Sequence, residues 1–286
     1  MEVSRALIFI HIMKAAGTSF NAVLEQQFKA DKIYSSYGVD LGEFERTFCQ
    51  LTAEEQSNIE LIRGHMIFGF HSFLPRAATY ITLVRNPIDR VVSHYNYIMR
   101  RPEHPHHAIF KKEKLGLLEF AKSTWDPIDT ASNIQTRYIA GDLLSDPLSS
   151  TLLVKAKENL VKYFPVIGIA ERFDESILLM QRAFGWKYTR CFYPLLNMRR
   201  RNEVNGLDIK VKDAILEKNQ LDVQLYELCL GRFAQQVSAA AITHENIARF
   251  ARWNNVAAPL IRAKIKYIWP NSRQEKWNHG FDWKSV

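Results

Sequence analysis

The stretch RALIFIHIMKAAGTSFNAVLEQQF, residues 5–28, joins an apolar run to an amphipathic pattern through a turn that contains glycine. Residues 5–11 are apolar and β-branched over the length of a strand, and the apolar residues of 18–28 recur at helical spacing. A strand–turn–helix unit of this kind directs backbone N–H groups and the positive end of the helix dipole to one point. It predicts an anion site, whose candidate ligands are Lys14, Ala16, Gly17, Thr18 and Ser19.

The order of residues in this turn differs from that of the nucleotide triphosphatase loop, G-x-x-x-x-G-K-[ST]. Here Lys14 precedes Gly17 instead of following it. We therefore expect the lysine to reach across the mouth of the turn. The anion that fits such a turn is a phosphate or a sulfate group.

Three further stretches have the composition of strands followed by turns: NIELIRGH at 58–65, TYITLVR at 79–85 and PVIGI at 165–169. Helical patterns are predicted at 115–122, 130–140, 150–163, 208–217, 219–236 and 245–266, and a mobile loop at 101–114. The alternation predicts the α/β class, with a central parallel sheet flanked by helices and extra C-terminal helices from about residue 205. Because ligands bind at the carboxyl ends of such strands, the turns after residues 11, 65, 85 and 169 should meet.

The bulk composition is that of an ordinary globular protein, with 47% hydrophobic and 24% charged residues in 286. We expect a single domain over residues 1–286. No apolar run reaches the roughly 18 residues that a membrane span needs. The three cysteines are widely spaced, which indicates a reducing compartment and no zinc site. These features together predict a cytoplasmic protein.

The net charge of +8 favours anionic partners, and most of the excess lies in residues 199–286. A solvated basic surface explains the charge equally well. The basic and aromatic C-terminal part could contact an acidic polymer, a membrane surface or a partner subunit, or simply pack as a helix. The oligomeric state stays open.

A second anion element follows the clearest strand. Arg85 ends that strand, Asn86 and Pro87 suit the start of a helix, and Ser93 lies two helical turns further on. An arginine in this position can bind a phosphate in bidentate fashion. Magnesium-dependent phosphoryl transfer usually places an acidic residue at the strand end instead. The sequence thus predicts two anion sites and no metal ligand set.

These two elements carry a resemblance to a known family. HIMKAAGTSF resembles the 5′-phosphosulfate loop of the sulfotransferases, and LVRNPIDRVVSHYNYI resembles their 3′-phosphate element, R-x-P-x-x-R-x-x-S-x-Y. The similar branch is that of the carbohydrate sulfotransferases related to heparan sulfate 2-O-sulfotransferase. IRGH at 62–65 resembles the segment that supplies its catalytic histidine, and 166–185 resembles its V-G-x-x-E segment. The first loop departs from the family pattern, with Met13, Ala15 and Ala16 where proline, threonine and glycine or serine are common.

The resemblance implies a P-loop-like sulfotransferase fold and a metal-free transfer of a sulfuryl group, in line, to an acceptor hydroxyl. The donor would be 3′-phosphoadenosine 5′-phosphosulfate (PAPS), and the product 3′,5′-adenosine bisphosphate. The acceptor would be a carbohydrate or a glycolipid, and no nucleic-acid partner is expected.

The resemblance also assigns roles within the nucleotide site. Lys14 would stabilise the leaving phosphate, and the residues from Ala16 to Ser19 would hold the 5′-phosphate. Arg85 and Ser93 would hold the 3′-phosphate. A late loop would cover the 3′-phosphate and the adenine, and its candidates are Arg199 and Arg200, which could equally be a surface charge run.

The acceptor hydroxyl needs a base, and histidine suits neutral pH. His65 is the leading candidate because it ends a predicted strand, and His71 is the alternative. The side chains of the predicted helix at 130–140 could face the acceptor or solvent. The acceptor-binding candidates are Asn133, Gln135 and Arg137 of this helix, together with His71.

Two other functions stay open. A magnesium-dependent, kinase-like phosphotransferase of related fold would need an acidic ligand, and Asp89 is the nearby candidate. A binding module for nucleic acid or an acidic glycan would explain the charge but not the paired turns.

Overall fold

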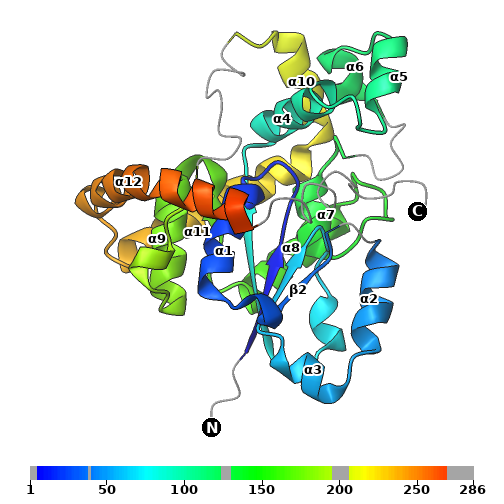
Figure 1. Ribbon diagram of the computed structural model, residues 1–286. Coiled ribbons are helices and arrows are strands. Elements are labelled where there is room, and N and C mark those ends of the chain that lie inside the picture. Colours follow the sequence, from blue (N-terminus) through cyan, green and yellow to red (C-terminus); the bar gives the residue numbers. More distant parts are fainter. Residues whose placement is uncertain (1–4, 38–39, 124–129, 195–205, 269–286) are drawn as a thin grey trace.

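The computed structural model describes residues 5–37, 40–123, 130–194 and 206–268. A five-stranded sheet in the order β2-β3-β1-β4-β5 forms its centre, with helices on both faces (Figure 1). All four neighbouring pairs are parallel, which confirms the predicted α/β class. The strands are β1 (Ala6–Ile10), β2 (Ile33–Ser35), β3 (Leu61–Gly64), β4 (Ala78–Val84) and β5 (Gly168–Ile169).

The central strand explains the apolar run at the start of the sequence. All five residues of β1 are buried, as expected for a strand covered on both faces. Phe9 packs edge-to-face on Phe20 of the first helix, with ring centroids 4.8 Å apart. On the other face, Tyr80 of β4 packs against Phe164, with ring centroids 5.3 Å apart. The core therefore lies on both sides of the sheet.

The helices are distributed over the whole chain. They are α1 (Gly17–Gln27), α2 (Leu41–Cys49), α3 (Ala53–Asn58), α4 (Pro87–Met99), α5 (His107–Lys112), α6 (Leu117–Lys122), α7 (Ile134–Ala140), α8 (Ser150–Tyr163), α9 (Phe173–Phe184), α10 (Ile209–Lys218), α11 (Gln220–Ala239) and α12 (His244–Ile268). Short 3₁₀ turns occur at Ala30–Lys32, Phe70–Phe73, Ala170–Arg172 and Tyr188–Arg190.

The expected helices all form, with small shifts at their ends, but two regions differ from the sequence-based picture. The prediction of a loop throughout 101–114 is wrong, because α5 occupies its centre. Phe110 accounts for this, since its buried side chain anchors the segment. The elements β2, α2 and α3 had no sequence prediction.

A second group of helices stands over the carboxyl ends of the strands (Figure 1). It consists of α4, α5, α6 and α10, and it has a hydrophobic cluster of its own. The buried members of this cluster include Val92, Phe110, Phe120 and Ile215. The group places α4 directly beyond the turns in which a ligand would bind.

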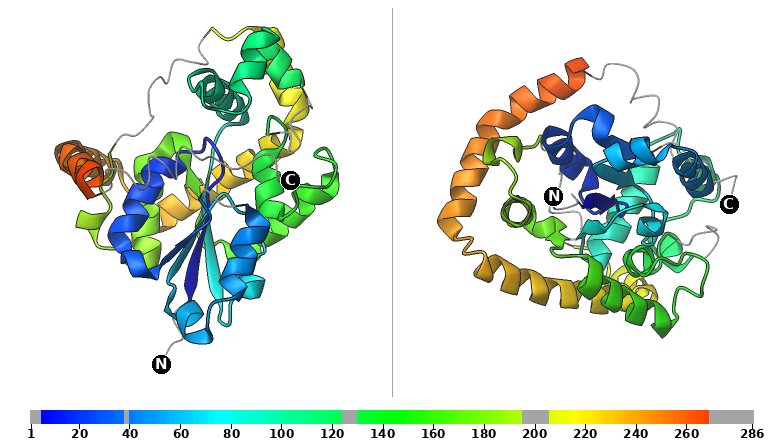
Figure 2. Two further views of the ribbon diagram at one scale, coloured as in Figure 1. Left: turned by 45° about the vertical axis from the view of Figure 1, so that its right-hand side comes forward. Right: turned by 90° about the horizontal axis from the view of Figure 1, so that it is seen from below.

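The C-terminal helices form the outside of the molecule. Seen from below, α11 and α12 follow one another as a curved belt around the sheet and its helices (Figure 2). Within the described residues, no helix combines the length and the apolar character needed to cross a membrane.

Candidate functional site

The predicted meeting of the turns is confirmed at the carboxyl edge of the sheet. The connections after the neighbouring strands β1 and β4 lead toward opposite edges of the sheet, which is the position at which ligands bind in such sheets. Nη1 of Arg85 donates to the carbonyl of Lys14 at 3.0 Å. The N–H of His11 donates to the carbonyl of Gly64 at 2.8 Å, and that of Asn86 to Oε1 of Glu171 at 2.9 Å. Each turn is thus joined to its neighbour.

The turn after β1 leaves its backbone donors open. Lys14 and Ala16 have positive φ values of 66° and 64°, a conformation that costs about 1–2 kcal/mol for such residues. The helix α1 then begins without a side-chain cap and without an acidic residue in its first turn. Among the described residues, none accepts a hydrogen bond from the N–H groups of Ala16, Gly17 or Thr18. Strained backbone and open donors at a helix N-terminus are the features that an anion site requires.

Gly17 is required by its neighbour His11. A Cβ atom placed on Gly17 would lie 2.1 Å from Cδ2 of His11, far inside van der Waals contact. The imidazole ring therefore lies directly against the first turn of α1, where only glycine leaves room for it.

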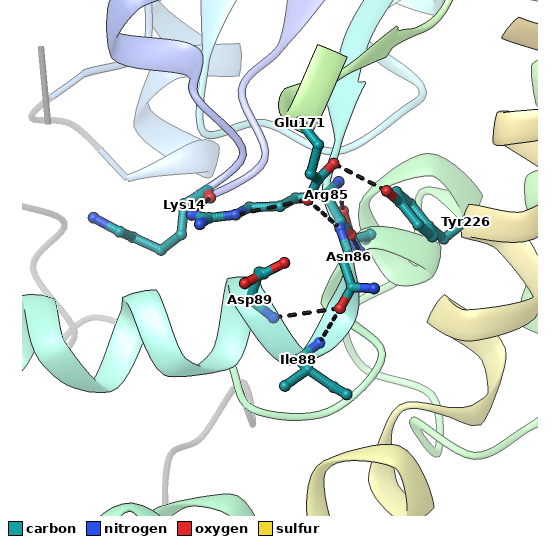
Figure 3. Close-up of polar contacts among 8 residues, drawn as sticks. Lys14, Arg85, Asn86, Ile88, Asp89, Glu171 and Tyr226 are labelled. Atoms are coloured by element: carbon teal, nitrogen blue, oxygen red, sulfur yellow. Dashed lines mark hydrogen bonds and ion pairs between the residues drawn. The ribbon is translucent and has the colours of Figure 1, made fainter. Parts of the chain in front are cut away.

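Lys14 links this turn to α4. Its ammonium lies 4.1 Å from the centroid of the Tyr97 ring, a cation–π contact. Figure 3 shows the side chain pointing away from Arg85, whereas its carbonyl faces the guanidinium. Sequence reasoning missed Tyr97, because its contact with Lys14 depends on how α4 crosses the sheet edge.

His65 follows β3 and is held by the turn. Its Nδ1 donates to the carbonyl of His11 at 2.8 Å, and the two rings stack with centroids 4.4 Å apart. With the proton on Nδ1, the lone pair of the neutral ring is on Nε2. Burial lowers the pKa of His65 to about 4, and the charge of Lys14 acts in the same direction, while the hydrogen bond to His11 opposes them. His65 is therefore neutral near pH 7 and can accept a proton at Nε2.

Arg85 is fixed through its backbone by Gln135. The Gln135 side chain accepts from the N–H of Arg85 and donates to its carbonyl, both at 2.8 Å. The guanidinium then extends across the turn toward Lys14 (Figure 3), with its side chain 29% exposed. This arginine is held firmly and still reaches solvent.

The start of α4 differs from the start of α1. Oδ1 of Asn86 accepts from the N–H groups of Ile88 and Asp89 at 3.0 and 3.4 Å, and Asp89 adds a negative charge to the first turn. The backbone donors of α4 are therefore already used. An anion bound here would depend on the side chains of Arg85 and Ser93, the latter half-buried.

Glu171 is a site residue that sequence reasoning did not single out, although its segment was noted. One carboxylate oxygen accepts from Asn86, and the other accepts from the hydroxyl of Tyr226 at 3.0 Å. Its Oε1 also lies 4.0 Å from Nε of Arg85. Glu171 thus ties the turn after β4 to β5 and to α11 (Figure 3).

The expectation that Asn133, Gln135 and Arg137 face an acceptor or solvent is wrong, because all three are at most 3% exposed. Asp222 of α11 explains the burial, since it accepts from the N–H groups of Gln135 and Thr136 and encloses the first turn of α7. Each of the three side chains donates a hydrogen bond to a backbone carbonyl of the protein, and that of Gln135 goes to Arg85 of the site.

His71 lies apart from the first turn. Its Nδ1 is 2.9 Å from the hydroxyl of Tyr80, and its ring packs against Phe68 and Tyr163. Tyr80 pairs with Ile8, which places this group midway along the sheet. The structure brings His65 to Lys14, whereas His71 faces α8.

The structure gives no site geometry for the remaining candidates from the sequence. Arg199 and Arg200 lie outside the described residues. His107, the first residue of α5, contacts the carbonyl of Ile98 at 2.9 Å through Nδ1. The described part of the chain contains no group of three or more His, Cys, Asp or Glu side chains that could hold a metal ion.

Comparison with known proteins points to one class. The sequence matches the model of the galactose-3-O-sulfotransferase family over residues 8–257. It is 23% identical to mouse galactose-3-O-sulfotransferase 2 over 185 residues, which are 61% of this chain and 45% of that protein. It is 30% identical to a Drosophila melanogaster heparin sulfate O-sulfotransferase over 130 residues, 43% of this chain and 37% of that protein. Mouse galactosylceramide sulfotransferase is 23% identical over 185 residues, 63% of this chain and 44% of that protein. The chain therefore spans less than half the length of these curated relatives.

Proposed function

Because the chain belongs to the galactose-3-O-sulfotransferase family, we propose that it transfers a sulfuryl group from PAPS to a hydroxyl group of a carbohydrate acceptor. The observation that carries the proposal is the placement of Lys14, His65 and Arg85 at one edge of the sheet. The family match also confirms the resemblance to carbohydrate sulfotransferases that the two sequence elements indicated.

The residues of the first turn fit a 5′-phosphosulfate group. Three open N–H groups lie at the start of α1, and the hydroxyl of Thr18 lies on its first turn. Negative charge at this end of a helix is stabilised by the dipole. Arg85 and Ser93 would hold the 3′-phosphate through their side chains, since Asn86 already caps α4. The two sites therefore differ in kind, one built from backbone and the other from side chains.

When bound, PAPS supplies the activated sulfuryl group. His65 would accept the proton of the acceptor hydroxyl at Nε2, in the tautomer that the carbonyl of His11 selects. The ammonium of Lys14 would supply positive charge at the mouth of the turn, where charge develops on the leaving phosphate oxygen. Arg85 would orient the nucleotide. Each of these roles uses an atom that the fold already holds in place.

The acceptor is proposed from the names of the relatives, which include galactose-3-O-, heparin sulfate O- and galactosylceramide sulfotransferases. Carbohydrate hydroxyl groups are what these acceptors share. We therefore propose a carbohydrate or the carbohydrate portion of a glycolipid as the acceptor.

One residue in the structure favours the kinase-like alternative. Glu171 is a carboxylate near a strand end, where a magnesium ligand would lie. However, both of its oxygens accept hydrogen bonds, from Asn86 and Tyr226. The arrangement of Glu171 suits a structural tie, and the nucleotide experiment below separates the two functions.

Calorimetric titration tests the nucleotide site directly. We expect 3′,5′-adenosine bisphosphate to bind more tightly than AMP, because AMP lacks the group that Arg85 would hold. Arg85→Ala should remove about 10- to 100-fold of the bisphosphate affinity, as expected for hydrogen bonds to a charged group. Arg46→Ala, an exposed arginine on α2, is the matched control. Binding of ATP with magnesium in place of the bisphosphate would favour the kinase instead.

A further inference from the structure

A chain of hydrogen bonds leads from Arg63 through Asn21 and Tyr37 to His11, next to the first turn. Nη1 of Arg63 is 2.6 Å from Oε1 of Glu25 and 3.3 Å from Oδ1 of Asn21. Nδ2 of Asn21 donates to the hydroxyl of Tyr37 at 2.7 Å, and that hydroxyl lies 2.6 Å from Nδ1 of His11. Arg63, Asn21 and His11 are 2%, 2% and 6% exposed. Tyr37, which joins Asn21 to His11, is half-buried.

The direction follows from the donors. A guanidinium group can only donate, so Arg63 requires the oxygen of the Asn21 amide to face it, which turns the amide nitrogen toward Tyr37. The Tyr37 oxygen accepts from that nitrogen, and its own proton can then be donated to Nδ1 of His11. His11 therefore accepts a hydrogen bond at Nδ1.

A neutral imidazole that accepts at Nδ1 carries its proton on Nε2. His11 is held in the neutral form, because burial lowers its pKa well below the usual value, and its coupling to the His65 ring and the charges of Lys14 and Arg63 act in the same direction. The ring consequently presents a single N–H group, at Nε2.

That N–H group lies at the start of α1. A Cβ atom on Gly17, the first residue of the helix, would be 2.2 Å from Nε2. Among the described residues, the hydrogen bond of the His11 ring is the one that Nδ1 makes with Tyr37, and none involves Nε2. The Nε2 atom therefore lies beside the first residue of α1, the helix at whose start the N–H groups of Ala16, Gly17 and Thr18 are open.

We propose that His11 is an additional anion-binding residue of the first turn, and that its Nε2–H group donates to an oxygen of the phosphate or sulfate group bound at the N-terminus of α1. Tyr37 and Asn21 are the positioning residues that select this tautomer. The proposal rests on the proposed function only for the identity of the anion. The Nε2–H donor of His11 does not depend on which anion binds.

Two variants of His11 separate binding from packing. In His11→Asn, the amide can replace Nδ1 toward Tyr37 but nothing replaces Nε2; in His11→Gln, the amide can reach the position of Nε2. We expect His11→Asn to weaken binding of 3′,5′-adenosine bisphosphate by about 10-fold or more, and His11→Gln to weaken it less. Binding of adenosine 3′-phosphate, which lacks the 5′-phosphate, should be unchanged in both.

Calorimetry gives two results that would overturn the proposal. The first is an equal loss for both nucleotides in His11→Asn, which would mean that the substitution acts only through packing. The second is unchanged bisphosphate binding in His11→Asn while Arg85→Ala still weakens it. In that case the proposed function would stand and the role of His11 would not.

A spectroscopic measurement tests the donor without any nucleotide. The ¹⁵N chemical shifts of the histidine rings, assigned with the His11→Asn variant, should show His11 protonated at Nε2 and unprotonated at Nδ1. Inorganic sulfate should shift the Nε2 signal. In Tyr37→Phe the ring should become a mixture of tautomers, a change that loss of packing alone would not cause. Protonation at Nδ1 in the unaltered protein would refute the proposal, even if the chain proved not to bind PAPS.

Discussion

Replacing Lys14 with methionine should lower kcat by about 10²- to 10³-fold, the usual effect of removing one preorganised charge from a transition state. Methionine keeps an unbranched stem that can still lie over Tyr97, so the substitution removes mainly the ammonium group. Lysine and methionine are equally unsuited to the positive φ of 66° at this position, so the substitution should not change the cost of that backbone conformation. The loss should therefore appear in turnover and not in folding.

The measurement is steady-state kinetics with PAPS and a carbohydrate acceptor, together with thermal unfolding. Lys14→Arg should recover part of the rate, because it restores the charge on a longer side chain. Lys29→Ala, an exposed lysine just beyond the end of α1, should behave like the unaltered protein. A normal kcat in Lys14→Met would show that Lys14 takes no part in the reaction.

Replacing His65 with asparagine should lower kcat by about 10²- to 10⁴-fold, the range typical of a general base. The asparagine amide can still donate to the carbonyl of His11, as Nδ1 does now, so the turn should keep its shape. Only the acceptor at Nε2 is lost. His71→Asn, which alters a histidine that contacts Tyr80, is the matched control and should retain its rate.

The pH dependence gives an independent check on His65. A base must be unprotonated, and the pKa of this ring lies near 4 instead of the ordinary value of about 6.5. The value of kcat/KM should therefore stay level as the pH falls from 7 toward 5, and decline only as the pH passes through the lowered pKa. The decline should disappear in His65→Asn. A midpoint at or above 6.5 in the unaltered protein would contradict this assignment.

The strand–turn–helix units were predictable because their signals are local. β1, β4 and α4 each carry an apolar run or a cap within a few residues, and Asn86 and Pro87 begin α4 as expected. By contrast, β2 has only three residues, all half-buried, and forms because β3 lies beside it. No pattern within so short a stretch could reveal it.

The candidate site was predictable where a residue follows a strand, as His65 and Arg85 do. It was not predictable on α7, because the sequence alone does not distinguish a buried polar residue from an exposed one. Gln135 is buried since Asp222, 87 positions later, accepts its backbone hydrogen bond. Tyr97 and Glu171 meet Lys14 and Arg85 only after the chain has folded.

The contact between Gly17 and the His11 ring also constrains how this turn can evolve. With 2.1 Å between a new Cβ atom and the ring, any side chain at position 17 collides with an imidazole at position 11. A lineage can therefore enlarge position 17 only after position 11 has lost its ring, because the reverse order passes through a sequence in which the two side chains collide. Among descendants of this sequence, a residue larger than glycine at position 17 should therefore occur only together with a change at position 11.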